Sequence, residues 1–202
     1  MAQRRFDTLG FAPAYTCEVD PELPGTGQWG YPHYGFHRDG EAAVPFRSRW
    51  GTPLLVRVAV TGTHQWVGSF EAGGMHALTG VFACPRPTDA LVACDGQAYL
   101  VDVTTPARTT AVDLWPVTQV RRVRSLDLVV LVSHLYLAAL GPTGLAWHSE
   151  RLCLDDLRVL DATAHGIRCC GDFVGSTEEF TVDPHSGQLR SGPRFLDSWT
   201  EP

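Results

Sequence analysis

The dipeptide Asp95-Gly96, set between two apolar runs, constrains the fold of this chain more than any other feature of its sequence. The runs cover residues 91–94 and 97–103, and the second alternates, with Tyr99, Val101 and Val103 on one face. An Asp-Gly pair between apolar segments is the strongest short-range signal for a β-hairpin, because the tight turn needs residues that tolerate a left-handed backbone. The sequence therefore predicts an antiparallel hairpin at the centre of a β-rich protein.

This hairpin pattern recurs along the chain. The stretch Tyr-Leu-Val-Asp-Val that begins at Tyr99 is echoed from Tyr136 and from Phe180, and a fainter copy begins at Trp66. The intervals are 33, 37 and 44 residues (99 − 66, 136 − 99 and 180 − 136). Intervals near forty residues with several strands each are typical of propeller blades or of a similar array of antiparallel meanders. We expect the four aromatic residues to hold equivalent positions in successive modules that share one hydrophobic interior.

Short strands bounded by turn residues are predicted through most of the chain. They cover residues 54–60, 65–70, 77–84, 108–114, 117–123, 145–151, 157–160, 166–170, 178–182 and 188–190. Residues 126–140 could form one helix, since Leu, Ala and His tolerate that conformation, but the repeat favours strands at 128–132 and 135–140. The fold class predicted is all-β, with antiparallel meander repeats that are propeller-like (small or partial) or else form a twisted β-sandwich. The segment Phe-Thr-Val-Asp-Pro-His-Ser-Gly from Phe180 resembles the outer-strand turn of many propeller blades, although no Trp-Asp or Gly-His signature of a WD40 repeat accompanies it.

Three regions are expected from the distribution of Pro, Gly and aromatic residues. Residues 1–45 form an irregular arm, because Pro and Gly interrupt it too often for a long helix or strand. The arm is rich in aromatic residues, so we expect it to pack on the domain. Residues 46–195 form the β-repeat domain, and residues 196–202 form a polar tail.

Composition excludes several classes of function. A formal net charge of −6 argues against a nucleic-acid binder, and no apolar run is long enough to span a bilayer. The N-terminus lacks the apolar region of a signal peptide, so we expect a cytoplasmic protein. The chain has no Lys and no Asn, as expected of a GC-rich bacterial genome, and this excludes a Walker or Schiff-base lysine. The sequence carries no signal for an oligomeric state.

The candidate binding residues lie in the N-terminal arm. They are Trp29, Tyr31, His33, Tyr34, His37 and Asp39. Two histidines four positions apart could ligate zinc from one face of a helix, but Pro32 and Gly35 argue against a helix there. No Glu supplies the general base of a His-Glu-x-x-His motif. We therefore assign no metal ligand, no catalytic residue and no cofactor.

Asp155-Asp156 is a second group that could carry chemistry. Paired carboxylates can hold a divalent ion or act as acid and base, but in β-rich proteins such a pair more often caps a turn. The prediction is therefore a non-catalytic binding module, with another protein as the favoured partner. One alternative is a metal-dependent hydrolase that uses His33, His37 and Asp39, or Asp155 and Asp156. Another is an immunity or accessory protein that blocks a partner's active site with its acidic surface.

Overall fold

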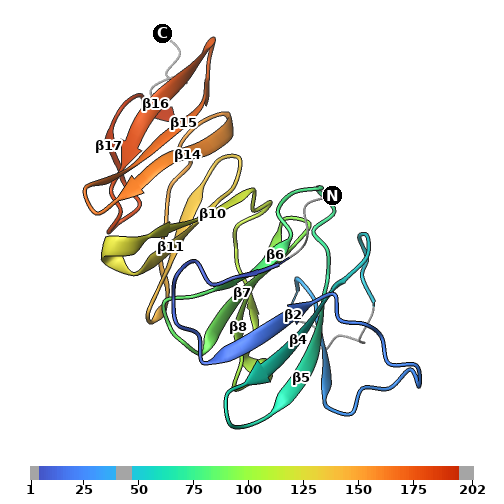
Figure 1. Cartoon of the computed structure of the whole chain (residues 1–202). Helices are drawn as coiled ribbons and strands as arrows, with labels where there is room; N and C mark the ends of the chain where they lie inside the picture. The colour runs from blue at the N-terminus through green and yellow to red at the C-terminus, as the bar shows by residue number, and fades with distance from the viewer. Residues whose placement is uncertain (1–4, 40–46, 196–202) are drawn as a thin grey trace. The chain divides into compact units, whose positions relative to one another are not determined.

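Nearly all the regular structure of the protein is β-strand, as the sequence predicts (Figure 1). The computed structural model describes residues 5–39 and 47–195. Within these ranges the only helical segments are two 3₁₀ turns, η1 (Pro106–Arg108) and η2 (Arg124–Leu126). No helix in the described ranges has the length and apolar character needed to cross a bilayer. Residues 196–202, expected to form a polar tail, lie outside the described residues.

The chain divides into two units, residues 1–116 and 117–202, where the sequence suggested one β-repeat domain over 46–195. Each unit contains two sheets and one apolar core. The prediction of repeated antiparallel meanders is therefore confirmed, but the repeating block is a pair of sheets.

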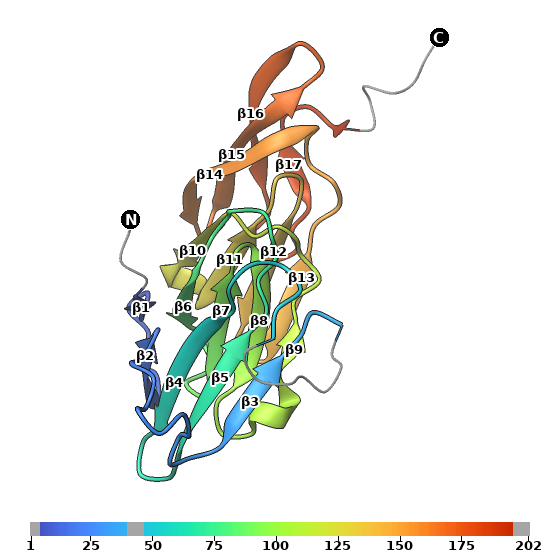
Figure 2. The same cartoon turned by 90° about the vertical axis from the view of Figure 1, so that its right-hand side faces the viewer.

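Unit 1 begins with a four-stranded sheet in the order β2-β4-β5-β3 (Figure 2). Its strands are β2 (Tyr15–Val19), β3 (His33–Phe36), β4 (Leu54–Val60) and β5 (Gln65–Phe70). The strands β2, β4 and β5 pair antiparallel, whereas β3 lies parallel to β5 at the edge. The alternating burial of β4 follows from its alternating sequence, with Leu54, Val56 and Val58 in the core.

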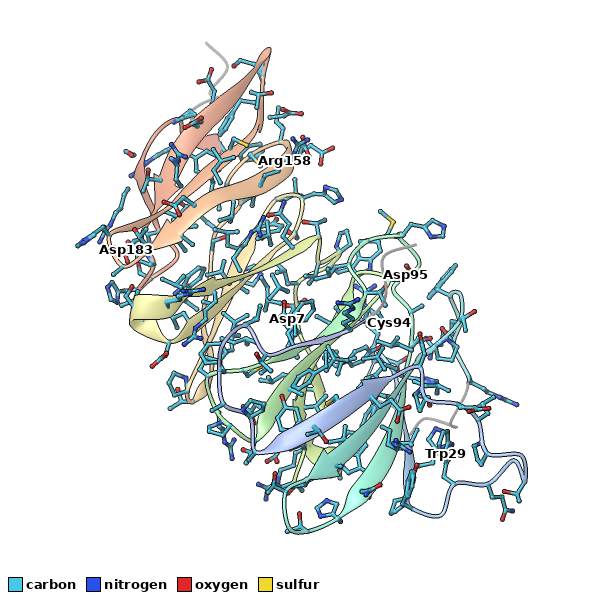
Figure 3. All side chains as sticks on the ribbon, viewed as in Figure 1. Asp7, Trp29, Cys94, Asp95, Arg158 and Asp183 are labelled. Atoms are coloured by element: carbon cyan, nitrogen blue, oxygen red, sulfur yellow. The ribbon has the colours of Figure 1, made fainter. Side chains whose placement is uncertain are left out.

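The second sheet of unit 1 has the order β1-β6-β7-β8-β9. Its strands are β1 (Phe6–Asp7), β6 (Gly80–Ala83), β7 (Asp89–Cys94), β8 (Gln97–Asp102) and β9 (Thr110–Ala111). The β7–β8 hairpin turns at Asp95 and Gly96, both with positive φ, as the sequence predicts (Figure 3). The strand predicted at residues 108–114 is limited to β9, because η1 takes the residues before it.

Both sheets of unit 2 are antiparallel meanders in chain order. The first contains β10 (Gln119–Val123), β11 (Leu128–Val132), β12 (Leu137–Gly141) and β13 (Gly144–His148). The second contains β14 (Asp155–Thr163), β15 (Gly166–Phe173), β16 (Ser176–Val182) and β17 (Leu189–Ser191). Residues 126–140 thus include two strands, β11 and β12, as the repeat pattern favoured.

The four aromatic residues expected to be equivalent do not share one interior. Trp66 and Tyr99 are buried in the core of unit 1, and Phe180 is buried in the core of unit 2. Tyr136 lies before β12, half-buried, with its ring 5.5 Å from that of His148. Tyr99 and Phe180 lie on β8 and β16, each the third of four successive antiparallel strands, whereas Trp66 lies on β5 and Tyr136 precedes β12.

The true counterpart of Trp66 is Trp147. The Trp66 indole Nε1 donates to the Val103 carbonyl at 2.9 Å, and the Trp147 Nε1 donates to the Pro184 carbonyl at 2.9 Å, each bond spanning 37 positions. The two donors and the two acceptors are separated by the same shift (147 − 66 = 81 and 184 − 103 = 81). In each unit, one tryptophan therefore joins the first sheet to a loop of the second sheet, the loop after β8 in unit 1 and the loop after β16 in unit 2.

Aspartates at the same shift shape these two loops. The Asp102 carboxylate accepts the N–H groups of Thr104 at 3.0 Å and Thr105 at 3.2 Å. The Asp183 carboxylate likewise accepts those of His185 at 2.7 Å and Ser186 at 3.2 Å. Such Asx turns fix the backbone after a strand. The hydrogen bond from His185 lowers the pKa of Asp183, with help from Arg190.

The Pro- and Gly-rich segment expected to form an irregular arm contains β1, β2 and β3, with irregular chain between them. Two of these strands pair parallel to strands far along the chain, β1 with β6 and β3 with β5. Short strands of this kind leave little trace in sequence periodicity, because long-range pairing decides them. The segment does pack on the domain, since Tyr15 and Phe36 are in the core.

Candidate functional site

A pocket of about 630 Å³ in unit 1 brings four of the six candidate binding residues together. Its first wall is β3 with the residues that follow it, and its second wall is the η1–β9 segment with Tyr99. The lining residues are His33, Tyr34, Gly35, Phe36, His37, Arg38, Asp39, Tyr99, Pro106, Ala107, Thr109, Thr110 and Ala111. Pockets of this size that mix aromatic, apolar and a few polar groups are typical of binding sites.

Aromatic packing holds β3 in place. Phe36 stacks on Phe70 at 4.7 Å between ring centroids, and Trp66 meets Tyr34 and Phe36 edge-on at 5.8 and 6.2 Å. Gly68 makes room for this stack, since a Cβ there would lie 3.0 Å from the Phe36 ring. These contacts fix the wall of the pocket to the core of unit 1.

The backbone of β3 has an open edge. The Pro32 and Phe36 carbonyls accept the N–H groups of Val67 and Glu71, on the β5 side of the strand. Because polar groups alternate along a strand, those of Gly35 point away from β5. The sheet order places no further strand on that side within the described residues. This edge borders the pocket.

A buried carboxylate anchors the chain around β3. Glu71 is 3% exposed and accepts the backbone N–H groups of Arg38 at 3.2 Å and Arg49 at 3.0 Å. The Arg49 guanidinium also pairs with Asp39 at 2.6 Å. The Glu71 backbone carbonyl accepts the hydroxyl of Tyr99 at 3.0 Å. Asp39 is therefore neutralised by an arginine at the rim of the pocket, which does not suit it for acid–base chemistry.

Each wall of the pocket carries a buried polar atom without a hydrogen-bond partner among the described residues. These atoms are His37 Nε2 and Thr109 Oγ1. Burial lowers the pKa of His33, so its imidazole is neutral at pH 7. Because buried polar atoms gain from a partner, the pocket favours a ligand that offers hydrogen-bonding groups as well as apolar surface.

The remaining two candidates lie outside this pocket. Trp29, which is labelled in Figure 3, and Tyr31 belong to the connection between β2 and β3. Their ring centroids lie 5.7 Å apart. A hydrogen bond with Tyr31 raises the pKa of Arg57, which also pairs with Glu18. Arg57 lies on the face of its sheet opposite the core, so Trp29 and Tyr31 do not contribute to the site that contains His37.

The metal-dependent alternative finds no support in the geometry. His33 begins the extended strand β3, which ends at Phe36, so His33 and His37 are not one helical turn apart, as ligation of zinc from one helix face requires. No group of three or more His, Cys, Asp or Glu residues in the described ranges could hold a metal ion.

The second acidic group is occupied by local contacts. Asp156 pairs with Arg158, and Asp155 accepts the Asp156 N–H at 2.8 Å and lies 3.5 Å from His134. The Asp155 side chain is 70% exposed. The pair was expected to cap a turn, but both residues lie at the start of β14, where the pairing with β15 shifts register, and their carboxylates contact different neighbours.

Sequence analysis missed the second wall of the pocket. Thr109 and Ala111 lie where a longer strand was expected, and Tyr99 was assigned only to the repeat. A local signal does exist, because Pro106 follows the Asp102 turn and proline favours the first position of a helical turn. That signal predicts η1 but gives no reason to place it beside β3.

Comparison with known proteins leaves the chain without an assigned family. No family model matches it, and no curated protein matches it. Among solved structures it is similar to the N-terminal domain of Nup159, at 14% identity and a TM-score of 0.38. The match covers 95% of this chain and 53% of that one, so this chain spans about half the length of that structure. A similarity this slight supports no argument about fold or function.

Proposed function

We propose that the protein is a non-catalytic binding module that takes a segment of another protein into the pocket between β3 and the η1–β9 segment. The observation that carries the proposal is the pocket itself, because it combines aromatic walls, the open edge of β3 and the buried atoms His37 Nε2 and Thr109 Oγ1. An extended peptide supplies what this combination requires: main-chain groups for the strand edge and a side chain for the aromatic wall.

Electrostatics favour binding over catalysis at this site. Asp39 is paired with Arg49 and burial lowers the pKa of His33, so among the described residues that line the pocket neither side chain is arranged as a base beside a nucleophile. Glu71 is occupied by two backbone N–H groups. The carboxylates of Asp39 and Glu71 therefore hold the chain around the pocket in place.

The test uses the full chain and a peptide selected on it from a random twelve-residue phage library. Thr110 is exposed and lines the pocket, so Thr110→Trp places a large ring in the pocket without burying it in the core. We expect this change to weaken peptide binding about tenfold or more, a loss of about 1.4 kcal/mol, measured by fluorescence polarisation.

Arg108→Trp is the matched control, since Arg108 is exposed on η1 but does not line the pocket. It should leave the dissociation constant within about twofold, a change of less than about 0.5 kcal/mol. Equal binding by the wild type and Thr110→Trp, or equal losses in both variants, would reject the pocket as the binding site.

A further inference from the structure

The strand that contains Trp66, β5, has an outer neighbour, whereas the equivalent strand of unit 2 has none among the described residues. In unit 1, β5 is covered on its outer side by β3. In unit 2, β13 carries Trp147 and is the edge strand of its sheet, with no described strand beyond it. The place that β3 fills in unit 1 is therefore open in unit 2.

A groove of about 420 Å³ lies at this place. It is lined by His148, Ser149, Glu150, Ser186, Gly187, Gln188, Leu189 and Arg194. The shift that relates Trp66 to Trp147 relates Val67 and Gly68, the partners of His33 and Tyr34 in β3, to His148 and Ser149. It also relates Pro106, at the start of η1, to Gly187. The groove is thus bounded by the same two parts of the unit between which β3 lies in unit 1.

The backbone of β13 is oriented to receive a strand. The Ser149 N–H donates to the Leu137 carbonyl at 2.9 Å, and the Leu137 N–H donates to Ser149 Oγ at 2.9 Å, so Ser149 faces β12. Alternation along β13 turns the polar groups of His148 outward. Glu150 follows the end of β13 and is equivalent, by the same shift of 81 positions, to Ser69, which lies opposite Gly35 of β3. In unit 1, the residue equivalent to His148 is Val67, whose N–H donates to the Pro32 carbonyl just before β3 at 2.9 Å.

The groove differs from the β3 site in the side chains it accepts. Gly68 leaves room for the Phe36 ring, but its counterpart Ser149 is 5% exposed and uses its hydroxyl in the bond to Leu137. Gly187 lies against the Trp147 ring, which a Cβ on Gly187 would approach to 2.5 Å. An aromatic residue like Phe36 therefore finds no space here. The lining is polar, with an exposed Glu150 and an exposed Arg194.

The geometry points to a strand-addition site at β13, which takes an extended segment of another protein, parallel to β13, with small or polar side chains. Main-chain hydrogen bonds to His148 and Glu150 supply the affinity, as in other cases of strand addition to a sheet edge. Glu150 and Arg194 complement charges of both signs in the segment. This site is separate from the pocket of unit 1.

The experiment selects twelve-residue peptides from a random phage library on the Thr110→Trp protein, so that the pocket of unit 1 is blocked. Amide hydrogen exchange with a selected synthetic peptide should show new protection at His148 and Glu150. Peptides that protect neither amide, or a selection that yields no binder, would overturn the proposal whatever the outcome for the pocket of unit 1.

Two variants of one residue then isolate the main-chain bond. His148→Pro removes the outward N–H but leaves the β12 ladder intact, since proline is tolerated on an edge strand whose N–H faces solvent. We expect it to weaken peptide binding about tenfold. His148→Ala keeps the N–H, so its dissociation constant for the peptide should be within about twofold of that of the protein with His148. Near-ultraviolet circular dichroism confirms that both variants fold. Equal binding by the two variants would overturn the proposal, as would a dimer of this chain that His148→Pro dissociates, because a second copy would then be the occupant.

Discussion

Both units pack two sheets around one apolar core, but the order of the strands in the sheets differs between them. Unit 2 follows the chain, and each of its strands pairs with its neighbour in sequence. Unit 1 inserts β3 and β1 out of order, each parallel to its partner at the edge of a sheet. The shared part is the tryptophan bond that joins the two sheets of a unit, and the added part is the strand that forms a wall of the pocket. The tryptophan hydrogen bond therefore stabilises both units, whereas β3 lines a pocket in unit 1 alone.

The largest expected effect on stability comes from removing the tryptophan that joins the two sheets of a unit. Trp66→Ala should lower the free energy of unfolding by about 3–5 kcal/mol, because Trp66 is 1% exposed and its replacement leaves a cavity and an unpaired Val103 carbonyl. Trp147→Ala is the equivalent change in unit 2, where the indole is 8% exposed. Hydrogen exchange should show lost protection mainly within the unit that carries each change.

Trp66→Phe is the control for the ring, since it retains most of the apolar volume and removes only the N–H. Its cost should be about 1–3 kcal/mol, the range for a buried group left without its hydrogen bond. Uniform loss of protection across residues 5–195 in Trp66→Ala would show that the two units unfold together. It would contradict the expectation that each tryptophan stabilises mainly its own unit.

These equivalences show how far sequence reasoning reaches. The bounds of β4, β5 and β11 were predicted from local patterns, the alternating residues of β4 and the short apolar runs of β5 and β11, each bounded by turn residues. The turn at Asp95-Gly96 was predicted because its chemistry is local too. The similarity of the segments at Tyr99 and Phe180 reflects a real equivalence, since the two residues lie on β8 and β16 and are separated by the same 81 positions as Trp66 and Trp147.

The equivalence of Trp66 and Trp147 and the second wall of the pocket could not be predicted, because both depend on contacts between residues far apart in the sequence. Trp66 was matched with Tyr136 instead of Trp147, because the partner carbonyls at Val103 and Pro184 carry no sequence signature. The binding candidates around His33 were chosen for their chemistry, and their meeting with Thr109 follows only from the parallel pairing of β3. Parallel edge strands need long-range closure, which periodicity does not encode.

A smaller effect on the free energy of unfolding is expected at a position where the two units carry different residues. Gly187 stands where unit 1 has Pro106, and its φ of 73° favours glycine. Gly187→Ala should cost about 1–3 kcal/mol in the free energy of unfolding, because it adds backbone strain and a clash with the Trp147 ring.

Gly175→Ala is the matched control, since its φ of 85° brings the same strain but nothing lies within 4 Å of the added Cβ. Urea denaturation should give a smaller loss for this variant, about 1 kcal/mol. Equal losses for the two changes would mean that strain alone sets the cost and that the Gly187 contact with Trp147 contributes nothing.

The smallest expected effect concerns His33, on β3, a strand that has no counterpart in the described part of unit 2. Burial lowers the pKa of His33 in the folded protein below its ordinary value of 6.5, so the unfolded chain binds the proton more readily. Stability is therefore unaffected by this group well above pH 6.5 and falls as the pH drops through 6.5 toward the lowered pKa. His33→Gln should reduce the loss in melting temperature between pH 7.5 and pH 5.5, measured by calorimetry. His64→Gln, a change of an exposed histidine in the β4–β5 turn, is the control and should leave that loss as in the wild type. If His33→Gln kept the full loss, proton uptake elsewhere would explain the acid sensitivity, and β3 would have no part in it.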